Sequence, residues 1–309
     1  MNALRWTLLA LGSLIIIALG ISGCGGGSQP TIESGKIAFV SSRSGQYRIY
    51  TMNFAGSNVT LISVAGSDVS SPALSADQSK IAYVSMQNGN ADIYVANAGN
   101  SGTPVRITDN SANDTQPAWS PTGETLAWTR EANESVILDT IVVKALSGEE
   151  QELIGDARNP CWSPTGDRLA FTSRRDGAEA IFLYTLSDGS TSKLMTLPQD
   201  SLGIDHLSWS PNGAIAYGCY DTTVESPSGD IYLVNSSSGV TTPLIATAAD
   251  EGHPAWSASG NKLVYYTDAD GNYEIYVANV DGTGQTRLTN DPSDDGTPGT
   301  SRSRRFFPR

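Results

Sequence analysis

Hydrophobic and polar positions repeat along this chain with a period of about 45 residues. The stretches "PAWSPTGETLAW" (117–128) and "PCWSPTGDRLAF" (160–171) nearly coincide, and related stretches begin at residues 73, 208 and 255. The aligned reference position holds Leu74, Trp119, Trp162, Trp209 and Trp256, at intervals of 45, 43, 47 and 47 residues. A partial copy, "GKIAFVSS" (35–42), precedes them. The pattern indicates one repeated structural unit.

Each unit contains four strand-like segments. The first ends in a turn such as Ser-Pro-Thr-Gly, in which proline presets φ and glycine accepts a left-handed backbone. The second and third are apolar at successive positions, as in "KIAYVS" (80–85) and "DIYVAN" (92–97), so both of their faces must be covered. The fourth segment is short. Four antiparallel strands every 45 residues or so predict the blades of a β-propeller, in which each blade packs between two neighbours.

We therefore predict an all-β fold over residues 35–301, a six-bladed β-propeller of four-stranded antiparallel blades. The first unit lacks its opening strand, while "DGTPGTS" (295–301) aligns with "EGHPAWS" (251–257). We expect residues 296–301 to supply the missing strand and close the ring, which removes two open sheet edges. The stretch "PTIES" (30–34) is the alternative closing strand. The basic tail 302–309 has no predicted structure.

Residues 1–23 have the pattern of a bacterial lipoprotein signal peptide. Arg5 precedes the apolar run "LLALGSLIIIALGI" (8–21), and small residues stand just before Cys24. This resemblance to a lipobox implies that Cys24 is lipidated and that residues 24–34 form a flexible tether. An uncleaved membrane-spanning helix is the alternative, since the run is about long enough to cross a bilayer. In either case we expect the propeller outside the cytoplasm, with the anchor as its one membrane contact.

Composition narrows the set of partners. Asp and Glu outnumber Lys and Arg by 32 to 19, and the formal net charge is −13. Because an acidic chain repels phosphate backbones, we expect no nucleic-acid partner. Cys161 and Cys219 fall in different units, so we expect separate buried thiols on different strands, with a disulfide as the alternative.

Two histidines occupy the same position of their units, three residues before the reference tryptophan. They are His206 and His253, and the equivalent residues are Ser71, Gln116 and Asn159. If the first strand is innermost, these side chains ring one mouth of the central channel, beside the carboxylates of Asp114, Asp205 and Glu251. We interpret the ring as a candidate contact surface for a ligand or a protein. A polar rim that only solvates the channel entrance is the simpler alternative.

Other motifs point to no catalytic or metal chemistry. Two imidazoles without a third fixed ligand favour no metal site, and we expect no cofactor. Ser190 and Lys193 match Ser-x-x-Lys, but they stand in a turn instead of the helix that the motif needs. "DADGN" (268–272) resembles part of a calcium loop but falls where every other unit has a hairpin. The repeated tryptophans are expected to be core wedges, with carbohydrate stacking as the alternative.

The units resemble the TolB-type (WD-like) propeller repeat, most clearly in "PAWSPTGETLAW" and "DADGNYEIYVANVDG". The resemblance covers residues 35–301 and implies the same six-bladed fold. For function it implies a non-enzymatic, monomeric interaction module that contacts envelope proteins from a lipid anchor. In a bacterium with two membranes, that anchor would lie on the periplasmic face of the outer membrane.

The resemblance does not extend to the whole of TolB, and it leaves an alternative function open. TolB carries an α/β domain before its propeller, and in this chain only about ten residues separate Cys24 from the first strand. The partners of TolB are therefore not implied. Propellers of this kind also occur in oligogalacturonate lyases, so a glycan-binding or polysaccharide-degrading protein that uses the channel mouth is the alternative function.

Overall fold

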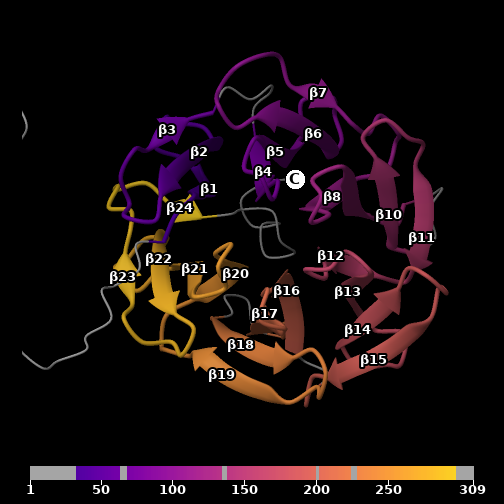
Figure 1. Ribbon diagram of the computed structural model, residues 1–309. Coiled ribbons are helices and arrows are strands. Elements are labelled where there is room, and N and C mark those ends of the chain that lie inside the picture. Colours follow the sequence, from indigo (N-terminus) through magenta and orange to yellow (C-terminus); the bar gives the residue numbers. More distant parts are fainter. Residues whose placement is uncertain (1–32, 63–67, 134–137, 200–201, 224–227, 297–309) are drawn as a thin grey trace, which may run out of the picture. The chain divides into compact units, whose positions relative to one another are not determined.

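The computed structural model describes residues 33–62, 68–133, 138–199, 202–223 and 228–296. These residues form six four-stranded antiparallel sheets that succeed one another around a central axis as the blades of a propeller (Figure 1). The predicted six-bladed, all-β fold is confirmed. The predicted signal peptide 1–23, the tether up to residue 32 and the tail 302–309 lie outside the described residues. In the part that is described, no helix is long and apolar enough to cross a membrane.

Each blade contributes one strand to each of four layers. In order from blade 1 to blade 6, the innermost strands are β24 (Asp295–Gly296), β4 (Val69–Leu74), β8 (Asp114–Trp119), β12 (Arg158–Trp162), β16 (Leu202–Trp209) and β20 (Glu251–Trp256). The second strands are β1 (Lys36–Ser41), β5 (Lys80–Ser85), β9 (Thr125–Arg130), β13 (Arg168–Ser173), β17 (Ala214–Asp221) and β21 (Lys262–Thr267).

The third strands are β2 (Arg48–Asn53), β6 (Asp92–Asn97), β10 (Thr140–Ala145), β14 (Ala180–Thr185), β18 (Gly229–Asn235) and β22 (Glu274–Asn279). The outer strands are β3 (Thr60–Leu61), β7 (Val105–Arg106), β11 (Gln151–Gly155), β15 (Thr191–Thr196), β19 (Thr241–Ile245) and β23 (Thr286–Arg287). The second and third strands are largely buried, while the outer strands are largely exposed. This gradient is the one that the apolar pattern of the repeats predicts.

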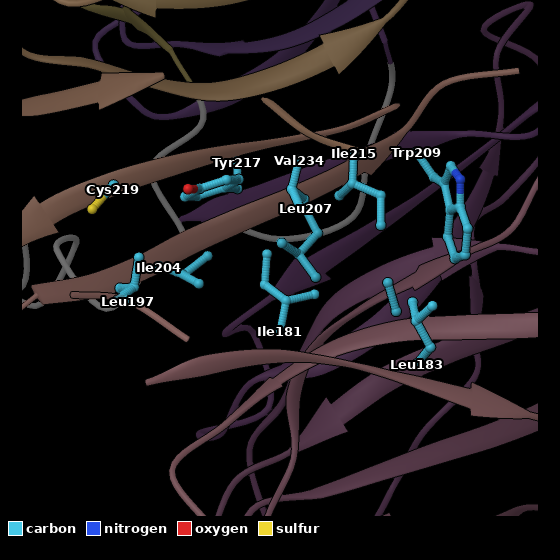
Figure 2. Close-up of a cluster of buried hydrophobic side chains, with 11 residues drawn as sticks. Ile181, Leu183, Leu197, Ile204, Leu207, Trp209, Ile215, Tyr217, Cys219 and Val234 are labelled. Carbon is cyan, nitrogen blue, oxygen red and sulfur yellow. The ribbon is translucent and has the colours of Figure 1, made fainter. Parts of the chain in front are cut away.

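The core consists of six hydrophobic clusters, each shared by two neighbouring blades. Figure 2 shows the cluster between blades 4 and 5, where Ile181 and Leu183 from β14 face Ile215 and Tyr217 from β17. Full burial of one such aliphatic side chain stabilises the fold by about 1.5–3 kcal/mol. Because there is one cluster for each seam, both faces of every sheet are used for packing.

Large and small residues alternate along the second strands, and this alternation shapes the seams. In blade 2, Ile81 and Tyr83 pack in the cluster shared with blade 1, while Ala82 lies on the opposite face. The small face of Ala82 receives Trp128 from blade 3, which is fully buried. A bulky face that nests on an alanine-lined face is how wedge-shaped blades reach the density of a protein core.

The C-terminal strand β24 completes blade 1. It pairs with β1 through the partners Val40 and Gly296 and the partners Ser41 and Asp295. Arg43 adds an ion pair of 2.5 Å with the buried carboxylate of Asp295. A hydrophobic cluster packs the completed blade 1 against blade 6. Closure from the C-terminal side was predicted for residues 296–301, of which 297–301 lie outside the described residues.

The alternative closing strand, residues 30–34, is not observed where it can be assessed. Glu33 and Ser34 are described and lie outside every strand. Residues 30–32 lie outside the described part of the chain.

Candidate functional site

Each complete innermost strand contains a β-bulge at the same place. The ladder between the first and second strands shifts register between Ser70 and Ala73 in blade 2 and between Thr115 and Ala118 in blade 3. Equivalent shifts occur in blades 4, 5 and 6. The five predicted positions, Ser71, Gln116, Asn159, His206 and His253, all lie within these bulges. Bulges re-aim side chains and are over-represented next to active sites.

Four of the five residues adopt a left-handed backbone. The φ angles of Ser71, Gln116, Asn159 and His253 are 49°, 55°, 54° and 50°. Each is followed by a proline in the sequence, which disfavours the right-handed helical conformation for the preceding residue. His206 is followed by Leu207 and has no positive φ. Non-glycine residues held in this region cluster at functional sites and ligand clamps.

A cavity of about 380 Å³ occupies the channel, and all five of these residues line it. They lie on the innermost strands, in the wall of the channel. From there the lining continues to Ser75 and Ser257, beside the turns that join the first and second strands. The sixth equivalent residue, Thr297, lies outside the described residues. The structure thus brings together the side chains that the repeat alignment selected.

An amide network fixes the wall on one side of the cavity. The side-chain NH₂ group of Gln116 donates to Oδ1 of Asn159, and Thr129 donates to Oε1 of Gln116 at 2.8 Å. The NH₂ group of Asn159 donates in turn to Oγ1 of Thr172 at 3.1 Å and to the backbone carbonyl of Ile204 at 3.3 Å. The network therefore links blades 3, 4 and 5 across the channel wall.

The two histidines line the cavity on blades 5 and 6, next to the amide network. Their rings stack with centroids 4.8 Å apart and an interplanar angle of 20°, and the His253 ring lies 5.7 Å from the ring of Tyr266. Burial lowers the pKa of His206 to about 4, because the charged imidazolium is poorly solvated inside the channel. At neutral pH the His206 ring is uncharged.

The three predicted carboxylates do not line the cavity. Asp114, Asp205 and Glu251 are 0%, 2% and 2% exposed, and their side chains lie behind the channel wall. Asp114 is paired with Arg130 through Nε at 2.9 Å and Nη2 at 3.1 Å. Glu251 accepts hydrogen bonds from the backbone and hydroxyl of Thr247, while burial raises its pKa.

Asp205 occupies a space that two glycines leave open. A β-carbon built on Gly218 would overlap its Oδ1 atom, and one built on Gly252 would lie 3.0 Å from Oδ2 and overlap the hydroxyl of Tyr266. The carboxylate of Asp205 and the hydroxyl of Tyr266 therefore converge on the backbone of β20, directly behind His253. Glycine inside a strand commonly marks such a close approach.

The cavity also has aromatic lining residues, among them Trp256, for which the sequence offered stacking only as an alternative, and Tyr266, which it did not select. Trp256 lines the cavity, and its indole is held in place by a hydrogen bond from Nε1 to the backbone carbonyl of Ser208 at 3.1 Å. Tyr266 lines it beside the histidine pair. In contrast, Trp119 and Trp209 are buried between blades, as expected for core wedges. Tryptophans at the same position of the repeat therefore differ in their surroundings: Trp256 lines the cavity, whereas Trp119 and Trp209 are buried between blades.

Neither metal binding nor a disulfide has support in the described part of the chain. Among these residues no group of three or more His, Cys, Asp or Glu side chains could hold a metal ion. Cys161 on β12 and Cys219 on β17 are not joined by a disulfide, and burial raises the pKa of Cys161 to about 12. A thiol with such a pKa is almost entirely protonated, so it is a poor nucleophile.

The repeat, the ladder order and the closed ring define a six-bladed β-propeller of four-stranded blades. Residues 34–138, which include the strands β1, β2 and β3 of blade 1, all of blade 2 and the first half of blade 3, match the family model of the TolB beta propeller domain. Over these residues the chain is similar to that propeller domain. Among curated proteins, no sequence relative matches the chain.

Solved structures share the fold at low sequence identity. TolB from Acinetobacter baumannii has a TM-score of 0.72 and 23% identity, and the match covers 86% of this chain and 66% of that protein. The chain thus spans just under two thirds of that TolB. A protein from Agrobacterium tumefaciens described as a putative TolB has a TM-score of 0.61 and 16% identity, over 86% and 91% of the two chains. An oligogalacturonate lyase in complex with manganese has a TM-score of 0.50 and 14% identity, over 85% and 75%.

Proposed function

We propose that this protein is a non-enzymatic interaction module of the bacterial cell envelope, which holds partner proteins on the rims of its propeller. One observation carries the proposal: the six inter-blade clusters use both faces of every sheet for packing. The loops at the two rims, the outer strands and the channel are what remains for contact. Binding residues commonly lie on loops that a rigid scaffold positions.

The likeness to TolB structures supports an envelope location. The sequence supports a lipid anchor, since the apolar run 8–21 stops at the small residues before Cys24. Cys24→Ser would then release the protein from membranes or leave it unprocessed. A Cys24→Ser protein that is processed normally and remains in the membrane fraction would exclude the anchor.

The two rims differ in the loops that form them. One, the hairpin rim, consists of the loops between second and third strands, such as residues 86–91 and 268–273. The other, the turn rim, consists of the turns between first and second strands, such as residues 120–124 and 163–167. A partner protein held by a rim would contact several loops of that rim at once and none of the outer strands.

Photo-crosslinking distinguishes these surfaces. A photoreactive amino acid would replace Gln87 or Ala269 on the hairpin rim, Thr122 or Thr165 on the turn rim, and Thr191 on outer strand β15 as the matched control. We expect one adduct of defined mass from both positions of the same rim in living cells, and none from Thr191. If no rim position gives an adduct, or all five label alike, the proposed function is wrong.

A further inference from the structure

The channel cavity has the size of a small-molecule site. Its volume of about 380 Å³ lies at the lower end of the range of roughly 300–1,000 Å³ that is usual for ligand pockets. An α-helix with its side chains is about 10–12 Å across and needs a wider groove. The volume therefore suits a compact ligand better than a folded segment of a partner.

The described lining is almost free of charge. It contains one ammonium, that of Lys36, and no carboxylate, since Asp114, Asp205 and Glu251 lie behind the wall. His206, with its low pKa, is neutral at physiological pH. A cationic ligand would lose its hydration without gaining a counter-charge, which is costly in a buried site. An anionic ligand would find only the ammonium of Lys36, which already donates to the backbone carbonyl of Ala98 at 3.1 Å. The lining therefore favours an uncharged ligand.

Hydrogen-bonding groups of both kinds face this neutral space. Gln116 and Asn159 present amides that are fixed by their mutual bond and by Thr129 and Thr172. On the blade 2 side, the Oγ atom of Ser71 is buried, and no described residue hydrogen-bonds to it. A buried hydroxyl without a partner is costly, and a ligand that both donates and accepts hydrogen bonds would satisfy it.

Flat ring faces complete the site. The indole of Trp256 is held by its bond to Ser208, and the rings of His206 and His253 are held by stacking. Tyr266 stands beside them. Pre-oriented rings give contact area at little conformational cost, and they suit ligands that have an apolar face and a polar edge.

From these features we propose that the channel cavity binds a neutral, hydroxyl-rich ligand of one or two sugar rings. The apolar face of a pyranose ring would lie on Trp256 or on the histidine pair, and its hydroxyl groups would bond to Ser71, Gln116 and Asn159. The cavity reaches the turn rim at Ser75 and Ser257, but its proposed ligand contacts are different residues from those chosen for crosslinking, so it adds a small-ligand function to the proposed protein-interaction function. A bound sugar would make contact with five of the six blades.

The test uses the full chain and a defined panel of probes. Glucose, galactose, N-acetylglucosamine, cellobiose, maltose and chitobiose are the neutral sugars, and glucuronic and galacturonic acids are the charged counterparts. Ligand-observed NMR would identify binders, and calorimetry would give their affinities. We expect at least one neutral sugar to bind at millimolar or lower concentration, with an affinity insensitive to salt.

Two variants assign the binding to the cavity. Ser71→Ala should leave thermal stability unchanged, because Oγ has no described partner to lose, and should weaken binding by about three- to tenfold. Trp256→Leu should weaken binding by about tenfold or more, although it also removes the bond to Ser208. Ser190→Ala, in an exposed turn, is the matched control and should bind as the unaltered chain does.

Three results would overturn the proposal. They are an absence of binding across the neutral panel, binding that Ser71→Ala and Trp256→Leu leave unchanged, and salt-dependent binding of the acidic sugars in preference to the neutral ones. None of them bears on the crosslinking result, because the rim loops and the cavity are altered at different residues.

Discussion

The carboxylate of Asp205 occupies the space that a side chain at Gly218 would need. A β-carbon at position 218 would overlap Oδ1 of Asp205, and Asp205 is only 2% exposed. The carboxylate therefore has little room to move aside. Position 218 on β17 is a glycine, and its missing side chain leaves the space that the buried carboxylate of Asp205 fills.

Gly218→Ala should therefore destabilise the protein by about 1–3 kcal/mol, the usual cost of overpacking a core. Urea denaturation measures this loss. Gly155→Ala is the matched control, because nothing lies within 4 Å of a β-carbon built there, and it should change stability by no more than about 0.5 kcal/mol. In the Gly218→Ala, Asp205→Ala double variant the two effects should be coupled by about 0.5–3 kcal/mol. If the two losses of unfolding free energy simply add, Asp205 is not the residue that occupies the space beside Gly218.

The low pKa of His206 makes stability depend on pH. Its pKa is about 4 in the folded protein and 6.5 in the unfolded chain. As the pH falls below 6.5, the unfolded chain takes up the proton first. The free energy of unfolding should therefore decrease between pH 6.5 and 4, by up to about 3 kcal/mol. His206→Gln should remove this part of the slope and leave the profile above pH 7 unchanged. An identical slope in the variant would contradict the burial of a neutral imidazole in the channel.

The C-terminal strand should be essential to the ring. Deletion of residues 295–309 would expose the edge of β1 and leave Arg43 without the carboxylate of Asp295. We expect a lower Tm and association through the free edge, measured by thermal unfolding and size-exclusion chromatography. Deletion of residues 302–309 alone is the control and should leave both unchanged. Equal behaviour of the two truncations would mean that β24 contributes nothing to closure.

Asp114 should act on stability because it is fully buried against Arg130. Asp114→Ala would leave the guanidinium, itself buried, with the partly exposed carboxylate of Glu150 as its nearest partner. Loss of one member of a buried pair typically costs about 3–5 kcal/mol. Asp109→Ala changes an exposed acid in the adjoining connection and should stay within about 0.5 kcal/mol. If the two variants unfold alike in urea, the pair with Arg130 is not structural.

The fold could be predicted from the sequence because the repeat combines a period with a burial pattern. Trp119, Trp162, Trp209 and Trp256 fix the period, and continuous apolar runs show that the second and third strands are covered on both faces. The repeat also identified five of the residues that line the cavity. Alignment alone was sufficient for this, because equivalent positions of a closed ring face the same axis.

The sequence could not predict which neighbouring side chains line the cavity and which lie behind its wall, since this depends on the bulges. The acids were expected at the channel mouth because they stand close to the selected positions in the sequence, and a regular strand would place Asp114 and Gln116 on the same face. The left-handed backbone of Gln116 breaks the alternation, so the amide lines the cavity while Asp114 stays inside the sheet. The proline that follows four of the five bulge residues was the available signal. No proline follows His206, and in that blade the bulge residue does not have the positive φ of the other four.

Disulfide trapping across the seam tests the closed channel most directly, because the cavity exists only if β24 completes the ring. Ser41 and Asp295 are paired across β1 and β24, so Ser41→Cys with Asp295→Cys, in a Cys24→Ser chain, should form an intramolecular disulfide under mild oxidation. The control pair is Ser41→Cys with Asp109→Cys. Because Asp109 lies in the connection between blades 2 and 3, this pair should remain reduced. A Ser41–Asp295 pair that stays reduced in the folded protein would contradict the closed six-bladed ring and the site within it.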